Sequence, residues 1–160
     1  MKSIIPLLAV SLATLTLVAA DPPMPAVFQL RLVRDSSSAD TEQVTITRAA
    51  KETNRATQEV LHISKLPLLD HSVVRSAFVI TNGFTGGPEI IVEFTEEGGK
   101  RLAKLTEENV GKRVAVFING KVQSAPQIVA QITGGRIVVD GPFTLEEANR
   151  LGDKISRRSK

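Results

Sequence analysis

The sequence predicts an α+β fold, a mainly antiparallel sheet with two helices packed on one face. Three observations support this class. Short segments with alternating apolar residues recur along the chain. Asn119-Gly120 lies between two of them and is a strong signal for a two-residue hairpin. Two longer segments, 95–111 and 144–155, begin with residues that cap helices. The resulting order is strands, helix, strands, helix, which indicates a sandwich of one sheet and two helices.

The first 26 residues have the features of an export leader. Lys2 precedes an apolar run that ends in the small residues Val18-Ala19-Ala20. This pattern predicts a cleaved signal peptide over 1–20 and hence a periplasmic or secreted protein. The alternative is a membrane anchor, but a spanning helix needs about 20 apolar residues and this run is shorter. "DPPMP" then predicts an extended linker over 21–26, followed by a single domain over 27–160.

Composition narrows the possible functions. The 160 residues include no cysteine, which excludes disulfides, a thiolate zinc site and a cysteine nucleophile. The net charge is only +3, and tyrosine and tryptophan are absent. A surface of mixed charge with only six phenylalanines is a poor match to nucleic acids or sugars, which are bound by stacking on aromatic rings.

The first half of the chain predicts mainly strands. The segment 27–33 places Phe28, Leu30 and Leu32 on one face of a half-buried strand. A polar loop follows over 34–43. Residues 44–58 fit both a short strand, "VTIT", and a polar helix, "RAAKETNRATQ". Further strands are predicted over 59–65, 73–81 and 89–95, with a turn-like connection over 66–72 and a glycine-rich turn over 82–88.

The first predicted helix begins at the N-cap Thr95 and ends at Gly111. Its buried stripe consists of Leu102, Ala103 and Leu105. Gly98 and Gly99 weaken its first turn, so we expect close backbone packing there. Glu96 and Lys100 are spaced to form an ion pair.

The second helix begins with the capping box Thr144-Leu-Glu-Glu147. In such a box the side chains of the first and last residues each accept a hydrogen bond from the backbone N–H of the other. Phe143 precedes the box and is placed to pack on Ala148. The predicted buried face of this helix comprises Leu145, Ala148, Leu151 and Ile155.

Pro126 interrupts the returning strand of the hairpin, because proline has no N–H to give to a sheet. Alternation would place Val122, Ser124, Pro126 and Ile128 on one face and Gln123, Ala125, Gln127 and Val129 on the other. The proline predicts a protected sheet edge. The functional interpretation, compatible with it, is that extended polypeptide lies against this edge. The candidate polypeptide-binding edge is Lys121, Val122, Gln123, Ser124, Ala125, Pro126, Gln127 and Ile128.

No pattern indicates catalysis, a metal or a cofactor. His62 and His71 are the two histidines, and two ligands without a carboxylate cluster make a poor zinc site. Ser124 lacks the context of a catalytic serine. We therefore expect a non-enzymatic protein without a cofactor or bound nucleic acid. The basic C-terminus "RRSK" allows weak contact with anionic lipid, although a solvated tail is the favoured interpretation.

Four motifs resemble one family. "TEENVGKR", "GKVQSAP", "ITGG" and "FTLEEA" occur in that order within residues 106–148. Together they resemble the head subdomain of the first periplasmic domain of SecD, the accessory subunit of the Sec translocon. The resemblance is clearest over 59–155, and its upstream part, "EVLHISKLPLLDHSVVRSAFV", is looser.

The resemblance implies a periplasmic, non-enzymatic domain that contacts polypeptide emerging from the translocon. It also implies exported or unfolded polypeptide, and possible Sec translocon components, as partners. A full SecD has six transmembrane helices, whereas this sequence shows no spanning segment after its leader. We therefore expect a free-standing exported copy of the head that assists Sec-dependent translocation. The alternative is a generic cell-envelope interaction module without a Sec role.

Overall fold

The computed structural model describes residues 27–49 and 56–157. The predicted signal peptide and linker lie outside these residues, as does most of the basic C-terminal tail. The elements in chain order are β1 (Phe28–Arg34), β2 (Thr41–Ala49), β3 (Ala56–Ser64), β4 (Leu69–Asp70), the 3-10 helix η1 (His71–Val73), β5 (Val74–Thr81), β6 (Pro88–Phe94), α1 (Glu96–Glu108), β7 (Val114–Ile118), β8 (Lys121–Ser124), β9 (Arg136–Val139) and α2 (Leu145–Arg157).

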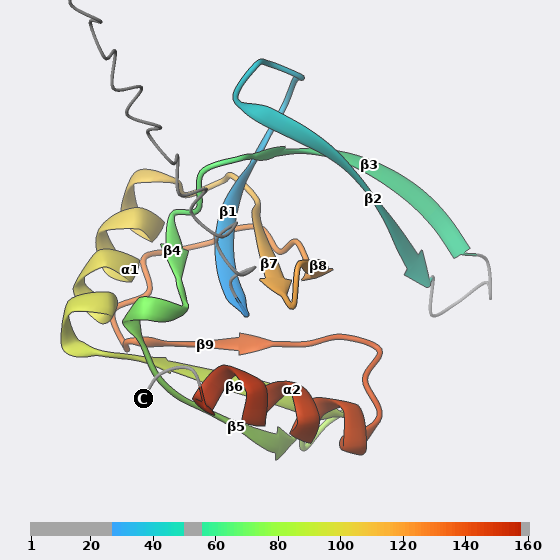
Figure 1. Cartoon of the computed structure of the whole chain (residues 1–160), viewed down its shortest axis with the longest axis vertical. Coiled ribbons are helices and arrows are strands. Elements are labelled where there is room, and N and C mark those ends of the chain that lie inside the picture. The colour runs from blue at the N-terminus through green and yellow to red at the C-terminus, as the bar shows by residue number, and fades with distance from the viewer. Residues whose placement is uncertain (1–26, 50–55, 158–160) are drawn as a thin grey trace, which may run out of the picture.

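The strands form two antiparallel sheets (Figure 1). The larger has the order β2-β3-β1-β7-β8, with β4 also paired to β1, and the smaller has the order β5-β6-β9. The predicted α+β class, with mainly antiparallel strands and two helices, is confirmed. The division into two sheets follows from the short segment β4–η1. There Asp70 accepts a hydrogen bond from the backbone of Ser72 at 2.9 Å, and the chain turns from the first sheet into the second.

The main hydrophobic core lies between the two sheets. The first sheet contributes Phe28 and Leu30 from β1, as their alternation predicted. The second contributes Ile90 and Val92 from β6, and the rings of Phe28 and Phe94 lie 6.0 Å apart. Because both sheets bury one face in the same core, each sheet keeps the apolar face of the other away from water.

Both helices border this main core. Helix α1 contacts β4 and β6, and α2 lies over β5 and β6 (Figure 1). Thr95 caps α1 as predicted, accepting a hydrogen bond from the Gly98 N–H at 3.1 Å. A Cβ atom on Gly98 would lie 2.6 Å from the Val73 carbonyl oxygen, which confirms the close backbone packing expected there.

Leu145 was predicted to be buried, and that prediction is wrong. Its side chain is 57% exposed, whereas Ala148 and Ile155, on the same stripe of α2, are fully buried. Leu145 occupies the first residue of the helix. Further along, Gly152 lies against Val79 and Ala77 of β5. The packing of α2 on the sheet therefore covers its later turns and leaves its beginning in solvent.

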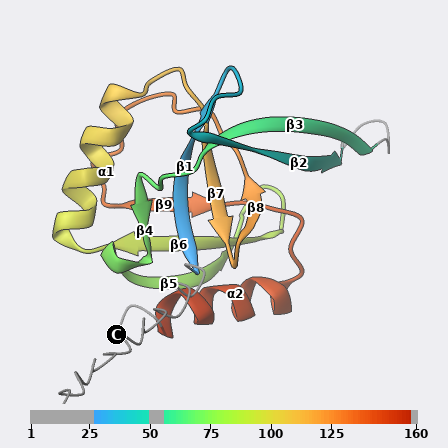
Figure 2. The ribbon, with the colours of Figure 1, turned by 45° about the horizontal axis from the view of Figure 1, so that its top comes forward.

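The sequence left 44–58 open, and the described part of this range, 44–49 and 56–58, belongs to a long hairpin. Strands β2 and β3 pair through nine consecutive residue pairs, from Thr41↔Ser64 to Ala49↔Ala56. We call this hairpin the arm. Figure 2 shows it crossing over the ends of β1 and β7 and then extending away from the domain. β3 joins the rest of the sheet through only two pairs with β1, Val33↔Ile63 and Arg34↔His62.

A second, smaller core lies beneath the base of the arm. Leu61 and Ile63 of β3 pack there against Ala115 and Phe117 of β7. The β1–β7 pair is therefore buried on both faces, because its other face belongs to the main core. Within the described residues, none of the helices is long and apolar enough to cross a membrane.

Thr144→Ala should lower the free energy of unfolding by about 1 kcal/mol, because the capping box is formed as predicted. The Thr144 hydroxyl accepts a hydrogen bond from the Glu147 N–H at 3.1 Å, and the Glu147 carboxylate accepts one from the Thr144 N–H at 2.9 Å. Urea unfolding at neutral pH measures the change. An unchanged midpoint would show that the box contributes nothing to stability.

The same box makes stability depend on pH. Hydrogen bonds from Thr144, first from its backbone N–H and then from its hydroxyl, lower the pKa of Glu147 from the ordinary value of 4.5. A lowered pKa in the folded state contributes stability above the unfolded value and loses it as pH falls through the folded value. Glutamine does not titrate, so the Glu147→Gln variant should lose less stability than the wild type when the pH is lowered from about 5 to about 3. Urea unfolding of both proteins at the two pH values measures the difference.

Candidate functional site

Strand β8 forms one edge of the larger sheet. Asn119 and Gly120 have φ angles of 51° and 74°, which is the two-residue turn that the sequence predicted. β8 is the last strand in the sheet order, so among the described residues no strand pairs with its outer side. Its backbone groups on that side are available to another extended chain.

The segment after β8 leaves the regular ladder and then returns to it. The register with β7 shifts between the pairs Val116↔Ser124 and Phe117↔Val122, so Gln123 is an extra residue in the edge strand. The segment returns to β7 at the proline itself, where the Pro126 carbonyl accepts a hydrogen bond from the Val114 N–H at 3.0 Å.

The predicted alternation of faces therefore fails along this segment. Ala125 and Ile128 were assigned to opposite faces but are both buried, and Val129 is 84% exposed. The bulge at Gln123 and the proline each break the period of two.

Arg113 connects this edge to the arm. Its Nε donates a hydrogen bond to the Ala125 carbonyl at 2.9 Å. Its Nη1 donates to Oε1 of Glu59, on β3, at 2.5 Å. One guanidinium group thus holds both the segment that follows β8 and the strand that crosses above it.

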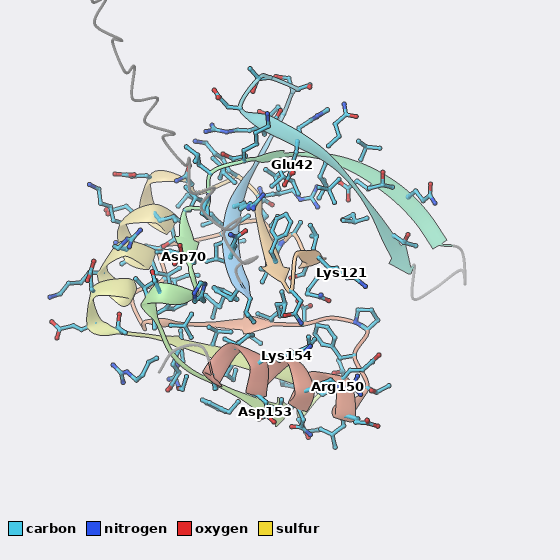
Figure 3. All side chains as sticks on the ribbon, in the orientation of Figure 1. Glu42, Asp70, Lys121, Arg150, Asp153 and Lys154 are labelled. Atoms are coloured by element: carbon cyan, nitrogen blue, oxygen red, sulfur yellow. The ribbon has the colours of Figure 1, made fainter. Side chains whose placement is uncertain are left out.

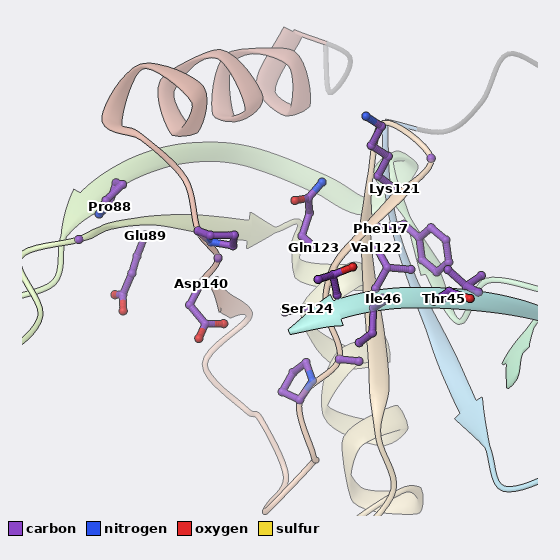
Figure 4. Close-up of a pocket in the computed structure, with 18 of the residues that line it drawn as sticks. Thr45, Ile46, Pro88, Glu89, Phe117, Lys121, Val122, Gln123, Ser124 and Asp140 are labelled. Carbon is purple, nitrogen blue, oxygen red and sulfur yellow. The ribbon is translucent and has the colours of Figure 1, made fainter. Parts of the chain in front are cut away.

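A groove of about 1100 Å³ lies beside this edge (Figure 4). Strand β8 and the residues after it form one side, and β2 of the arm forms a second. The third side consists of the β5–β6 loop with the start of β6, together with the connection from β9 to α2. The lining residues on which the argument below depends are Glu42, Phe117, Pro88, Glu89, Asp140 and Pro142.

The groove brings together six of the eight predicted site residues, Lys121 to Pro126. The other two lie elsewhere. The Gln127 side chain donates to the Gly111 carbonyl at 2.8 Å, and Ile128 is buried in the main core.

The sequence did not indicate the second and third sides of the groove. β2 was ambiguous, and the loop 82–87 carried only turn signals. A glycine-rich turn and a polar strand give no sign that they meet a hairpin edge from another part of the chain.

The groove contains both charged and apolar groups. On the arm, the Glu42 carboxylate accepts a hydrogen bond from Arg31 at 2.5 Å, and the Arg31 guanidinium lies 4.6 Å from the centre of the Phe117 ring. Figure 3 shows Lys121 on β8, below the arm that carries Glu42. Within the described part of the chain, no cluster of three or more His, Asp or Glu side chains could hold a metal ion.

The fold and the groove define a small α+β domain with an exposed sheet edge, and comparisons with known proteins identify its family. The family model described as the SecDF P1 head subdomain matches residues 42–155. The chain belongs to this family.

Two relatives and one solved structure illustrate the match. The protein translocase subunit SecDF of Thermus thermophilus is 32% identical over 133 residues, covering 79% of this chain and 18% of that protein. The protein translocase subunit SecD of Leptotrichia buccalis is 40% identical over 88 residues, covering 55% of this chain and 22% of that protein. A structure of SecDF, described as a membrane component that enhances protein export, matches with a TM-score of 0.62 and 29% identity, covering 82% of this chain and 62% of that chain.

The chain spans about a fifth of the length of these two curated relatives. The similarity thus concerns one module of a larger export protein.

Arg113→Lys should weaken the connection between the β8 edge and the arm. The single ammonium group of lysine cannot reproduce the two guanidinium hydrogen bonds to Ala125 and Glu59. We expect a loss of about 1–2 kcal/mol in the free energy of unfolding, on the scale of hydrogen bonds to a charged group. Hydrogen–deuterium exchange should become faster in 121–128 and in β3.

Arg150→Lys is the matched control. Arg150 pairs with Glu146 at 3.0 Å on the exposed surface of α2, and its replacement should change the free energy of unfolding by less than about 0.5 kcal/mol. Equal effects of the two substitutions would contradict the role assigned to Arg113.

Proposed function

We propose that this domain binds extended polypeptide during Sec-dependent protein export, through the outer edge of β8 and the adjoining groove. The observation that carries the proposal is an unpaired sheet edge that opens onto a groove of about 1100 Å³. Family membership supports it, because the matched relatives are named as protein translocase subunits.

Strand addition suits a factor that handles many different sequences. An incoming chain pairs with an edge through main-chain hydrogen bonds, which every residue except proline can form. The short β8 offers few such bonds, since it comprises only Lys121–Ser124. We therefore expect a Kd in the micromolar range or weaker, about −8 kcal/mol at best.

The apolar lining of the groove supplies the remaining affinity. Val122 of β8 and Ile46 of the arm both line it, beside the Phe117 ring. These side chains can cover apolar residues of a bound strand. Pro126 stops the paired edge from lengthening, which limits unwanted association with other edges.

The proposal also covers location and organisation. Residues 1–20 act as a signal peptide, 21–26 as a linker and 27–160 as one head domain in the periplasm or outside the cell. This part rests on the leader pattern and on the family resemblance. The domain acts by binding, without catalysis, and Sec translocon subunits are its proposed partners.

A photoreactive amino acid at Lys121 should crosslink to an unfolded secretory polypeptide, because Lys121 is exposed and lines the groove. The control position is Leu66, which is 79% exposed and is not among the residues that line the groove. Crosslinking should be several-fold stronger at Lys121. Adding Gln123→Pro, which removes one backbone N–H from β8, should reduce it. Equal crosslinking at both positions would contradict binding at the edge.

Affinity purification from membranes of the native host should recover Sec translocon subunits with this protein. The same purification with the Gln123→Pro variant tests whether recovery of the Sec subunits depends on polypeptide bound at β8. Binding of unfolded polypeptide without any Sec subunit would favour the generic cell-envelope interaction module.

A further inference from the structure

The side of the groove opposite β8 carries two carboxylates. Glu89 lies at the start of β6, and Asp140 follows the end of β9. Figure 4 shows both side chains on the far side of the gap from Gln123 and Ser124, with their carboxylates pointing the same way along that side. Two chain segments 51 positions apart in the sequence thus place negative charge along one side of the proposed binding site.

Among the described residues, no basic side chain forms an ion pair with Glu89 or Asp140. Glu89 does accept a hydrogen bond from the neutral Asn82 amide at 2.5 Å. Glu42, the third acidic residue of the lining, differs because Arg31 neutralises it. The lining therefore has a negative side, although the whole chain has a net charge of +3.

Prolines adjoin both carboxylates along the groove. Pro88 precedes Glu89, and Pro142 follows Asp140 by two positions, and both line the groove. A lysine or arginine side chain has an apolar stem and a charged end. Such a side chain can extend its charged end to a carboxylate while its stem covers apolar groups of the lining.

We infer that the groove selects extended polypeptide segments with lysine or arginine at alternating positions. This inference rests on the proposed function. In a strand added to β8, every second side chain points to the same face, so basic residues spaced by two give one face a row of charged ends that can reach toward Glu89 and Asp140. Acidic segments are repelled from the same place. The selection adds a preference to main-chain pairing, which by itself discriminates little between sequences.

Three peptides of equal length test the inference. Each alternates valine with one other residue, which is lysine, glutamine or glutamate. Binding to the purified protein is measured by fluorescence anisotropy at low and at high salt. The variant protein is Glu89→Gln with Asp140→Asn. The control variant, Glu107→Gln with Glu108→Gln, removes the same number of charges from the exposed surface of α1.

The lysine peptide should bind about tenfold more tightly than the glutamate peptide at low salt, since each exposed ion pair contributes modestly. High salt and the Glu89→Gln/Asp140→Asn variant should both reduce this preference, while the glutamine peptide keeps its affinity. The control variant should keep most of the preference.

Other outcomes separate the two levels of the proposal. If the lysine and glutamate peptides bind equally well, the charge selection is wrong and the proposed function stands. If no peptide binds, the proposed function is wrong as well. Light scattering on the same samples detects a second copy as the occupant, and a dimer that no peptide dissociates would overturn both.

Discussion

The pairing of β1 with β7 is the constraint on which the rest of the structure depends. Five consecutive residue pairs join these strands, and each face of the pair is buried in a different core. Phe28 and Ile118 face the main core between the sheets, whereas Phe117 faces the small core under the arm. Because β7 continues directly into the hairpin turn, this pair also fixes where the β8 edge lies.

The groove follows from that arrangement. Its three sides come from different parts of the chain, and each is tied to a rigid element. Arg113 joins the edge to the arm, through Ala125 and Glu59. On the opposite side, the Asn82 amide is hydrogen-bonded to Glu89 across the base of the β5–β6 loop. An edge held in this way is ordered before a ligand arrives, which lowers the entropic cost of binding an extended chain.

The sequence predicted the helix caps and the hairpin turn correctly, because each of these features depends on a few neighbouring residues. Thr95 and Thr144 cap helices, and Asn119-Gly120 forms the hairpin turn, because these side chains or φ angles satisfy a need of the backbone within a few residues. The prediction for Leu145 failed because helical periodicity identifies a stripe but not how far along the helix the sheet extends. Within the ambiguous range, residues 44–49 and 56–58 form strands because they pair with each other and because Leu61 and Ile63, further along β3, pack on β7.

The sequence by itself determined the fold class, the start of each helix, the hairpin and the family, because caps, turns and consecutive motifs are local. The end of α1 was predicted wrongly, because the helix stops at Glu108 and not at Gly111. The sequence also identified β8 as an edge, since a proline excludes continuous pairing. Only the tertiary structure decided that the strands form two sheets, that the arm crosses β7, and that Glu89 and Asp140 line the same groove as β8. These features depend on contacts between segments far apart in the chain, and no local pattern of residues encodes such contacts.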